Sequence, residues 1–342
     1  MLRSFLTFLL LLCLCLSALP SCSANEEPLS VSFFSMDTYM TLKAYRDGHT
    51  EEETREALNA AKAEILRIEQ LFSVTSTDSE ISRLNRGEAL EDASADLIHL
   101  LRLSAEMHNK TNGAYDVTVY PLVELWGFTG EQQSVPAEGD IHTALLEIDF
   151  NKITVTQTAN GGYSVSANGA RLDLGSIAKG YAGQRASELL AQMGFNNVLL
   201  VLGGNVQLSG TKPDGSPFRI GIADPHKPDG IAFTLTCSEA LRDKLGAVNG
   251  LAVVTSGTYQ RNFEQDGKVY HHLLDLSSGY PCENGLSSVT VICPDGARAD
   301  ALSSSLFLLG YEKSLELYRA EGDFEAIFIT NTGEKLFTDG IG

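Results

Sequence analysis

The sequence of 342 residues predicts an α+β fold with mostly antiparallel sheets. Amphipathic helical segments are mixed with short β-rich segments, most of which have the pattern of antiparallel strands. No G-x-G-x-x-G motif follows the first predicted strand, which argues against a doubly wound dinucleotide-binding fold. No low-complexity linker or internal repeat divides the chain. We therefore expect one globular unit over residues 29–342.

The first third of this unit is predicted to hold one interrupted strand and two helices. Residues 30–42 are β-rich and alternate in polarity, with an interruption at Met36-Asp37-Thr38. Residues 51–72 place apolar side chains at three- and four-residue spacing after an acidic first turn, as expected of an amphipathic helix. A second helix is predicted at about residues 94–110, with Asn112-Gly113 as its stop signal. Both helices are expected to serve the core, so we assign them no chemistry.

The rest of the chain is predicted to be richer in strands. Residues 147–156 and 162–167 are expected to be strands around a turn at residues 159–162, and residues 178–193 a third helix closed by Gly194. Further strands are predicted at residues 198–202, 218–222, 232–237, 251–254, 286–292 and 324–330. A short apolar helix is predicted at residues 299–307.

The N-terminal segment predicts export and lipid attachment. Arg3 precedes an apolar run that is short for a membrane-spanning helix. Leu19-Pro20-Ser21-Cys22 resembles a bacterial lipobox, in which the cysteine is lipidated and becomes the first mature residue. An ordinary secretory signal cleaved near Ala24 is the alternative.

On this interpretation the chain has three parts. Residues 1–21 are the signal peptide, residues 22–28 a lipid-anchored tether with Cys22 as the lipidation site, and residues 29–342 the folded domain. The expected location is the extracytoplasmic side of a bacterial membrane.

The charge of the chain argues against nucleic acid as a partner. The 25 basic and 44 acidic residues give a net charge of −19, and loss of Arg3 with the signal peptide would leave 24 basic residues and a charge of −20. Such a chain repels phosphate backbones. An anionic ligand would therefore need a metal ion or helix N-termini to offset the repulsion.

Three cysteines remain beyond Cys22, namely Cys237, Cys282 and Cys293. No C-x-x-C or histidine-rich spacing accompanies them, so neither a zinc site nor a disulfide framework is predicted. Whether two of the three form one disulfide stays open.

The predicted helix at residues 299–307 carries two oxygen ligands on one face. Asp300 and Ser304 are four residues apart, so their side chains can converge on one point. Hard oxygen ligands of this kind are what Mg²⁺ prefers. The simpler interpretation is that Asp300 is only a favourable charge near the start of a helix.

Four other segments are polar or glycine-rich enough to suggest a binding site. One is residues 111–118, followed by residues 121–128 with the only tryptophan of the chain, and another joins residues 255–259 to residues 270–275. At residues 171–180 a strand is expected to turn through Gly175 into a helix N-terminus, which would expose backbone N–H groups to a phosphate, with Lys179 either assisting or merely solvated. Gly203-Gly204 would permit close approach of a ligand. His271 and His272 point to opposite faces of a strand, so at most one serves any given site.

Taken together, these segments resemble the ApbE-like flavin transferases, or FAD:protein FMN transferases, many of which are exported lipoproteins. The resemblance covers nearly the whole mature chain and implies a two-lobed α/β architecture with the FAD cleft between the lobes. Ten blocks in order carry it: Met36-Asp37-Thr38, Phe72-Ser73, Ser79-Glu80-Ile81-Ser82-Arg83-Leu84-Asn85, Gly113-Ala114-Tyr115-Asp116, Asp173-Leu174-Gly175-Ser176-Ile177-Ala178-Lys179-Gly180-Tyr181, Gly203-Gly204-Asn205, Gly221-Ile222-Ala223-Asp224-Pro225, Thr255-Ser256-Gly257, His272-Leu273-Leu274-Asp275 and Ala299-Asp300-Ala301-Leu302-Ser303-Ser304.

The resemblance implies a Mg²⁺-dependent transfer of the FMN part of FAD to a Thr or Ser hydroxyl of an acceptor protein, with release of AMP. The implied acceptors are flavoprotein subunits of membrane electron-transfer systems. The implied Mg²⁺ ligands are the side chains of Asp300 and Ser304 and the backbone carbonyl of Ser176. His272 would lie beside the reacting phosphates, where we expect it to deprotonate or orient the acceptor hydroxyl. The residues implied to line the FAD site are Met36, Ala114, Tyr115, Asp116, Asp173, Lys179 and Leu274.

Three positions of this sequence depart from the pattern of the family. Thr75 replaces a tyrosine that can stack on the ligand, which would weaken FAD binding by about 1 kcal/mol. Gln184 replaces a common aspartate and Leu276 a common proline.

The alternative functions are a Mg²⁺-dependent FAD pyrophosphatase, in which water replaces the acceptor, and a non-catalytic flavin-binding lipoprotein.

Overall fold

The computed structural model describes residues 27–130 and 132–341, which form fourteen strands, nine α-helices and one 3₁₀ turn. The strands are Leu29–Ser35 (β1), Thr38–Ala44 (β2), Thr154–Gln157 (β3), Tyr163–Ser166 (β4), Val198–Leu202 (β5), Asn205–Ser209 (β6), Arg219–Ala223 (β7), Ile231–Thr236 (β8), Leu251–Gly257 (β9), Asn262–Gln265 (β10), Lys268–His271 (β11), Leu286–Cys293 (β12), Glu325–Thr330 (β13) and Lys335–Phe337 (β14). The helices are Glu51–Phe72 (α2), Glu80–Asn85 (α3), Ala95–Lys110 (α4), Tyr120–Leu125 (α5), Glu138–Glu147 (α6), Ala178–Gln192 (α7), Glu239–Leu245 (α8), Gly296–Leu309 (α9) and Tyr311–Glu321 (α10), and the 3₁₀ turn is Phe150–Lys152 (η1).

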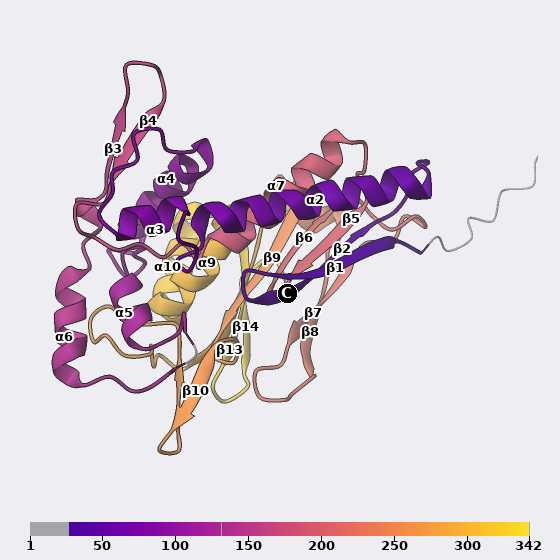
Figure 1. Cartoon of the computed structure of the whole chain (residues 1–342). Helices are drawn as coiled ribbons and strands as arrows, with labels where there is room; N and C mark the ends of the chain where they lie inside the picture. The colour runs from indigo at the N-terminus through magenta and orange to yellow at the C-terminus, as the bar shows by residue number, and fades with distance from the viewer. Residues whose placement is uncertain (1–26, 131, 342) are drawn as a thin grey trace, which may run out of the picture.

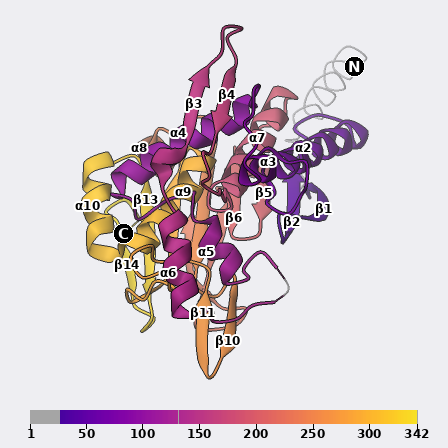
Figure 2. The same cartoon turned by 60° about the vertical axis from the view of Figure 1, so that its left-hand side comes forward.

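The centre of the molecule is an eight-stranded sheet in the order β1-β2-β5-β6-β9-β12-β13-β14 (Figure 1). Every neighbouring pair in it is antiparallel. Three two-stranded sheets complete the fold, namely β3-β4, β7-β8 and β10-β11. The hairpins β3-β4 and β10-β11 extend toward opposite ends of the molecule (Figure 2). The predicted α+β fold with mostly antiparallel sheets is therefore confirmed.

Both faces of the central sheet are covered. Helices α2, α7 and α9 pack on one face, and β7, β8 and α8 close a second core on the other. Successive residues of β9 show the division, because Val254 belongs to the first core and Val253 to the second. Burial on both faces explains why β12 is buried at every position.

A third apolar cluster is built from α5, α6 and the segment around β10 and β11. Its centre is Trp126, which is fully buried, donates its indole N–H to the Gly279 carbonyl at 2.9 Å, and lies against the rings of Phe128, Phe263 and Tyr270. This Trp126 cluster forms a separate lobe beside the main core.

The two long N-terminal helices form where the sequence predicts them. Thr50 caps α2 through a capping box with Glu53, and Leu58, Ile65 and Ile68 are buried on its inner face. Ser94 caps α4, which begins one residue later. The interruption predicted at residues 36–38 is the turn of the β1-β2 hairpin.

The prediction of a strand at residues 147–156 is wrong for the first half of that range. Glu147 ends α6, and residues 150–152 form η1, so only Thr154–Gln157 is a strand. Asp149 accepts a hydrogen bond from the Asn151 N–H at 3.0 Å and so favours the 3₁₀ turn over an extended backbone.

The helix predicted at residues 299–307 is longer than expected. It begins at Gly296, because Asp295 caps it by accepting from the Arg298 N–H at 2.8 Å. Among the described residues Cys237, Cys282 and Cys293 are free and buried, so none of them forms the disulfide that the sequence left open.

The predicted signal peptide, the Cys22 lipidation site and most of the tether lie outside the described residues and stay predictions. Within residues 27–130 and 132–341, no helix has the length and apolar character needed to cross a membrane.

Helices α7 and α9 touch through two glycines. A Cβ atom on Gly180 would lie 2.0 Å from the Gly296 carbonyl oxygen, and one on Gly296 would lie 2.5 Å from the Gly180 carbonyl oxygen. Real atoms cannot approach so closely, so the helices can meet here only without side chains.

Gly180→Ala is expected to destabilise the fold by about 3 kcal/mol or more, because the two helix backbones must separate. Gly183→Ala on the same helix is the control. Its Cβ would make ordinary contacts at 3.5 Å, and alanine favours a helix by about 1 kcal/mol over glycine. Urea denaturation measures both variants. Equal stabilities for the two would show that the close contact does not constrain the fold.

Candidate functional site

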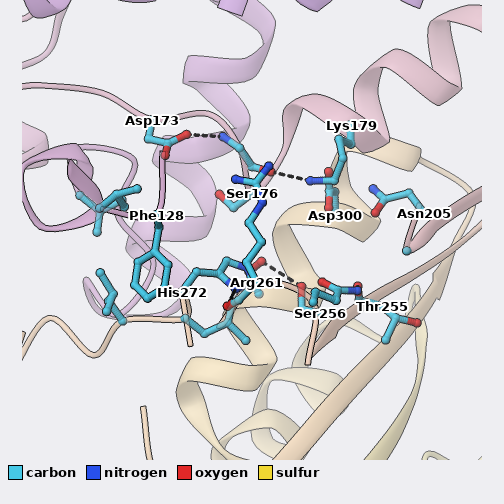
Figure 3. Close-up of a pocket in the computed structure, with 18 of the residues that line it drawn as sticks. Phe128, Asp173, Ser176, Lys179, Asn205, Thr255, Ser256, Arg261, His272 and Asp300 are labelled. Atoms are coloured by element: carbon cyan, nitrogen blue, oxygen red, sulfur yellow. Dashed lines mark hydrogen bonds between the residues drawn. The ribbon is translucent and has the colours of Figure 1, made fainter. Parts of the chain in front are cut away.

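A cavity of about 330 Å³ lies between the main core and the Trp126 cluster (Figure 3). Its volume is typical of small-molecule sites. All eleven pocket residues predicted from the sequence line it, although they come from segments far apart in the chain. They are Met36, Ala114, Tyr115, Asp116, Asp173, Ser176, Lys179, His272, Leu274, Asp300 and Ser304. The structure thus brings these residues together, while their individual roles stay predictions.

Two tight turns form one wall of the cavity. In the β1-β2 turn, Met36 and Asp37 adopt φ angles of 48° and 58°, and the Glu69 carboxylate fixes the turn by accepting from the Met36 N–H at 2.6 Å. In the β5-β6 turn, Gly203 has a φ of 64°, and a Cβ there would lie 2.5 Å from the Thr38 hydroxyl oxygen. Glycine at this position therefore lets the two turns pack against each other.

Asp300 is buried on α9 and points to the N-terminus of α7. It is 3% exposed, and its Oδ2 accepts a hydrogen bond from the Gly180 N–H at 2.7 Å. The alternative interpretation of Asp300 as a charge beside a helix start therefore applies, but to the neighbouring helix. Ser304 lies one turn further along α9, with its hydroxyl 3.1 Å from that of Ser256. Both side chains line the same cavity, as the four-residue spacing predicts.

The turn before α7 is held by its own polar groups. The Gly175 N–H donates to Asp173 at 2.7 Å, and the Lys179 ammonium donates to the Gly175 carbonyl at 3.0 Å (Figure 3). The Ser176 hydroxyl donates to the Tyr115 oxygen at 3.1 Å, and burial raises the pKa of Tyr115, which keeps the phenol neutral. Ile177 provides no side-chain cap, and the first turn of α7 is instead bonded through the Ala178 N–H to the Leu174 carbonyl at 2.8 Å and through the Gly180 N–H to Asp300.

Asp116 lines the cavity but is satisfied locally. Its Oδ1 accepts from the Thr118 N–H at 2.8 Å and from the Thr118 hydroxyl at 2.7 Å, and its Oδ2 lies 3.4 Å from His108. These bonds fix the loop before α5, so its carboxylate shapes the cavity wall.

His272 is held in one tautomer by Arg261. The Arg261 carbonyl accepts from the His272 backbone N–H at 3.1 Å and lies 3.2 Å from Nδ1. A carbonyl can only accept, so in the neutral ring Nδ1 carries the proton and Nε2 carries the lone pair. Burial, with a further contribution from the Arg261 charge, lowers the pKa of His272 to about 3, although the ring remains partly accessible from the cavity.

His271 has a different environment from its neighbour. It packs edge-on against Phe307 at 5.8 Å, and burial lowers its pKa to about 4. Only His272 of the two lines the cavity, as expected for neighbouring residues that point in opposite directions, while its role stays a prediction.

Arg261 lines the cavity but was not singled out from the sequence, whereas Phe128 and Tyr259 stand in segments that were. Arg261 stands in a short connection between two strands, and a single charged residue there gives no recognisable signal. Thr75 is exposed and does not line the cavity. Gln184, by contrast, accepts from the Gly296 N–H at 3.0 Å and thereby caps α9.

Comparison with known proteins identifies the family. The model of the ApbE family matches residues 36–328. The chain belongs to the ApbE family. A protein of Haemophilus influenzae named FAD:protein FMN transferase is 31% identical, over 91% of this chain and 89% of the relative. A protein of the same name from Klebsiella pneumoniae is 35% identical, over 80% of this chain and 82% of the relative.

Solved structures of ApbE proteins share this fold. The ApbE protein of Thermotoga maritima is 28% identical with a TM-score of 0.78, over 92% of this chain and 97% of that one. The flavinyl transferase ApbE of Pseudomonas stutzeri, in its apo form, is 30% identical with a TM-score of 0.75, over 92% of this chain and 96% of that one. The predicted family, the predicted fold and the assignment to the transferases are confirmed.

The lowered pKa of His272 predicts how stability changes with pH. Between pH 6.5 and 3 the unfolded chain protonates this ring while the folded chain keeps it neutral, so stability falls as the pH falls. His272→Asn should remove about 1–2 kcal/mol of the loss between pH 7 and pH 5. Urea denaturation of both proteins at the two pH values measures the difference. Identical losses would mean that the folded-state pKa of His272 is near 6.5.

Proposed function

We propose that this chain transfers the FMN part of FAD to a Thr or Ser hydroxyl of an acceptor protein, in a Mg²⁺-dependent reaction that releases AMP. The observation that carries the proposal is the meeting, in one cavity, of Asp300, Ser304, the N-terminus of α7 and a neutral His272. The names of the curated relatives support FAD as the substrate and a protein as the acceptor.

The residues present fit a Mg²⁺ ion. The Gly180 N–H donates a hydrogen bond to Oδ2 of Asp300, and in the described part of the chain no group donates to its Oδ1. Ser304 and the Ser176 carbonyl supply further hard oxygens at the same cavity. Within that part, no group of three or more His, Cys, Asp or Glu side chains could hold a metal. A few protein oxygens completed by phosphates and water are the usual environment of Mg²⁺.

When bound, Mg²⁺ would offset the negative charge of the pyrophosphate and of the leaving phosphate. The dipole of α7, whose first turn holds Lys179 at the cavity, and the ammonium of Lys179 add positive potential from the protein itself. This matters because the whole chain is strongly acidic.

In the proposed reaction the acceptor oxygen attacks the phosphorus on the FMN side of the pyrophosphate. The bond from that phosphorus to the bridging oxygen breaks, and AMP leaves with the bridging oxygen. The proton of the acceptor hydroxyl moves to Nε2 of His272, which the Arg261 carbonyl keeps unprotonated. Positioning and charge neutralisation supply most of the catalysis in such a transfer.

We further propose that the enzyme meets its acceptors at a membrane. Lipid attachment at Cys22 would hold it on the extracytoplasmic side of a bacterial membrane, beside flavoprotein subunits of electron-transfer systems. The lipobox-like motif Leu19-Pro20-Ser21-Cys22 is the observation behind this location. Recovery of Cys22→Ala and wild type in the same membrane fraction, with the same N-terminal mass, would contradict it.

Ser304 and its neighbour Ser305 provide a matched test of the metal site. Asp300→Ala should abolish transfer, and Ser304→Ala should lower its rate at least tenfold, because each loses a proposed ligand. Ser305→Ala should leave the rate unchanged, because the Ser305 hydroxyl is buried and unpaired among the described residues. Mass spectrometry of a co-expressed acceptor measures the added FMN. Full transfer by Asp300→Ala would overturn the proposal.

Two further outcomes of this assay separate the alternatives. Stoichiometric FMN and AMP from FAD and Mg²⁺ without any acceptor would favour the pyrophosphatase. FAD binding without turnover under any condition, and unaffected by Asp300→Ala, would favour the non-catalytic binding protein.

His272→Ala should lower the transfer rate about 10²–10⁴-fold, the usual contribution of a general base. In the wild type, kcat/KM for FAD should stay flat from pH 8 to pH 5, because a pKa near 3 keeps the ring neutral over this range. A rate that falls tenfold per pH unit below pH 6.5 would contradict the assigned ionisation. A wild-type rate for His272→Ala would remove the role altogether.

A further inference from the structure

An ion pair crosses the edge of the cavity. The Arg261 guanidinium lies 2.9 Å from the Asp37 carboxylate, and both residues line the cavity. The pair joins the β1-β2 turn to the connection between β9 and β10, two segments more than 200 residues apart. Figure 3 shows the Arg261 side chain extending across the pocket from the side on which His272 lies.

Asp37 differs from the other carboxylates that line the cavity. Asp116, Asp173 and Asp300 each accept a backbone N–H within the protein. Asp37 is paired instead with a side chain, and it is 76% exposed. It also occupies a left-handed conformation with a φ of 58°, which a residue with a side chain adopts only at a cost. Its carboxylate therefore serves the pairing with Arg261 rather than the turn.

Two cationic side chains of the described residues line the cavity, those of Lys179 and Arg261, and of these two Arg261 alone is paired with another segment. Lys179 bonds within its own turn, to the Gly175 carbonyl. The Arg261 side chain is 38% exposed, and an ion pair this open to water is weak. A guanidinium forms stronger, bidentate bonds with phosphate oxygens. A pyrophosphate entering the cavity can therefore compete with Asp37 for Arg261.

We propose that the Asp37–Arg261 ion pair is exchanged on substrate binding: Arg261 leaves Asp37 and binds a phosphate of the FAD pyrophosphate. This inference rests on the proposed function for the identity of the ligand. Arg261 is then a residue that binds substrate. Asp37 competes with the substrate for Arg261, which lowers substrate affinity, and it holds the arginine in place while no substrate is bound.

The exchange predicts opposite effects for the two partners. Arg261→Gln should raise the dissociation constant of FAD about tenfold, because it removes a phosphate contact. Asp37→Asn should lower it about threefold, because the competing charge is gone while asparagine still tolerates the left-handed turn. Arg261→Lys should fall between wild type and Arg261→Gln. Quenching of flavin fluorescence with FAD and Mg²⁺ at low ionic strength, without acceptor, measures the constants.

Two controls separate charge exchange from a change in fold. Glu51→Gln removes a similarly exposed ion pair with Arg55 on α2 and should leave FAD binding unchanged. Asp37→Gly removes the carboxylate and relieves the backbone, so it should also tighten FAD binding if Asp37→Asn folds poorly. Arg261→Gln should raise the KM for FAD more than it lowers kcat, because the carbonyl that orients His272 is retained.

The outcomes are distinguishable from failure of the proposed function. If the wild type binds FAD, and the Asp37 and Arg261 variants both weaken binding, the pair is a structural brace and the exchange is wrong. Unchanged binding in the Asp37 variants also overturns it. A folded wild type that binds no FAD overturns the proposed function and, with it, the ligand assigned to Arg261.

Discussion

The site depends on the contact between α7 and α9 at Gly180 and Gly296. The two helix backbones approach until no Cβ fits between them. At this separation each helix caps the other: Asp300 of α9 accepts the Gly180 N–H, and Gln184 of α7 accepts the Gly296 N–H. The carboxylate proposed to bind the metal is thereby fixed by a backbone bond rather than by a flexible side chain. Its position follows from packing, which is the most rigid constraint a protein interior offers.

Backbone hydrogen bonds address the electrostatic problem posed by an acidic chain. A cavity lined by four aspartates would repel a pyrophosphate, yet three of the four already accept backbone N–H groups. Those bonds stabilise the negative charges locally and leave Lys179, Arg261 and the start of α7 facing the ligand. The acidic side chains therefore build the walls and hold the turns, while positive potential is concentrated where phosphates would lie.

Residue types and their local spacing made the long N-terminal helices and most cavity-lining segments predictable from the sequence. The capping residues Thr50 and Ser94 and the apolar spacing behind them define α2 and α4, and the Asp and Gly residues of the turns identify the cavity-lining segments. The Trp126 cluster was not predictable, because its rings meet only after residues 126 and 263–280 fold together. Arg261 was missed for the same reason, since its partner Asp37 is distant in sequence. Contacts between residues that are far apart in the chain produce no periodic pattern in a single sequence, so sequence periodicity does not predict them.

The ionisation of His272 connects packing to chemistry. In the protein alone, burial and the nearby Arg261 charge oppose a proton on the ring, so His272 is neutral but a weak base. In the proposed reaction an anionic pyrophosphate enters beside it and binds Arg261. The negative charge of the pyrophosphate attracts a proton to the ring. Its bond to Arg261 offsets part of the arginine charge that opposes protonation. His272 therefore becomes a stronger base when substrate is in place, and the bond to the Arg261 carbonyl ensures that the proton is accepted at Nε2.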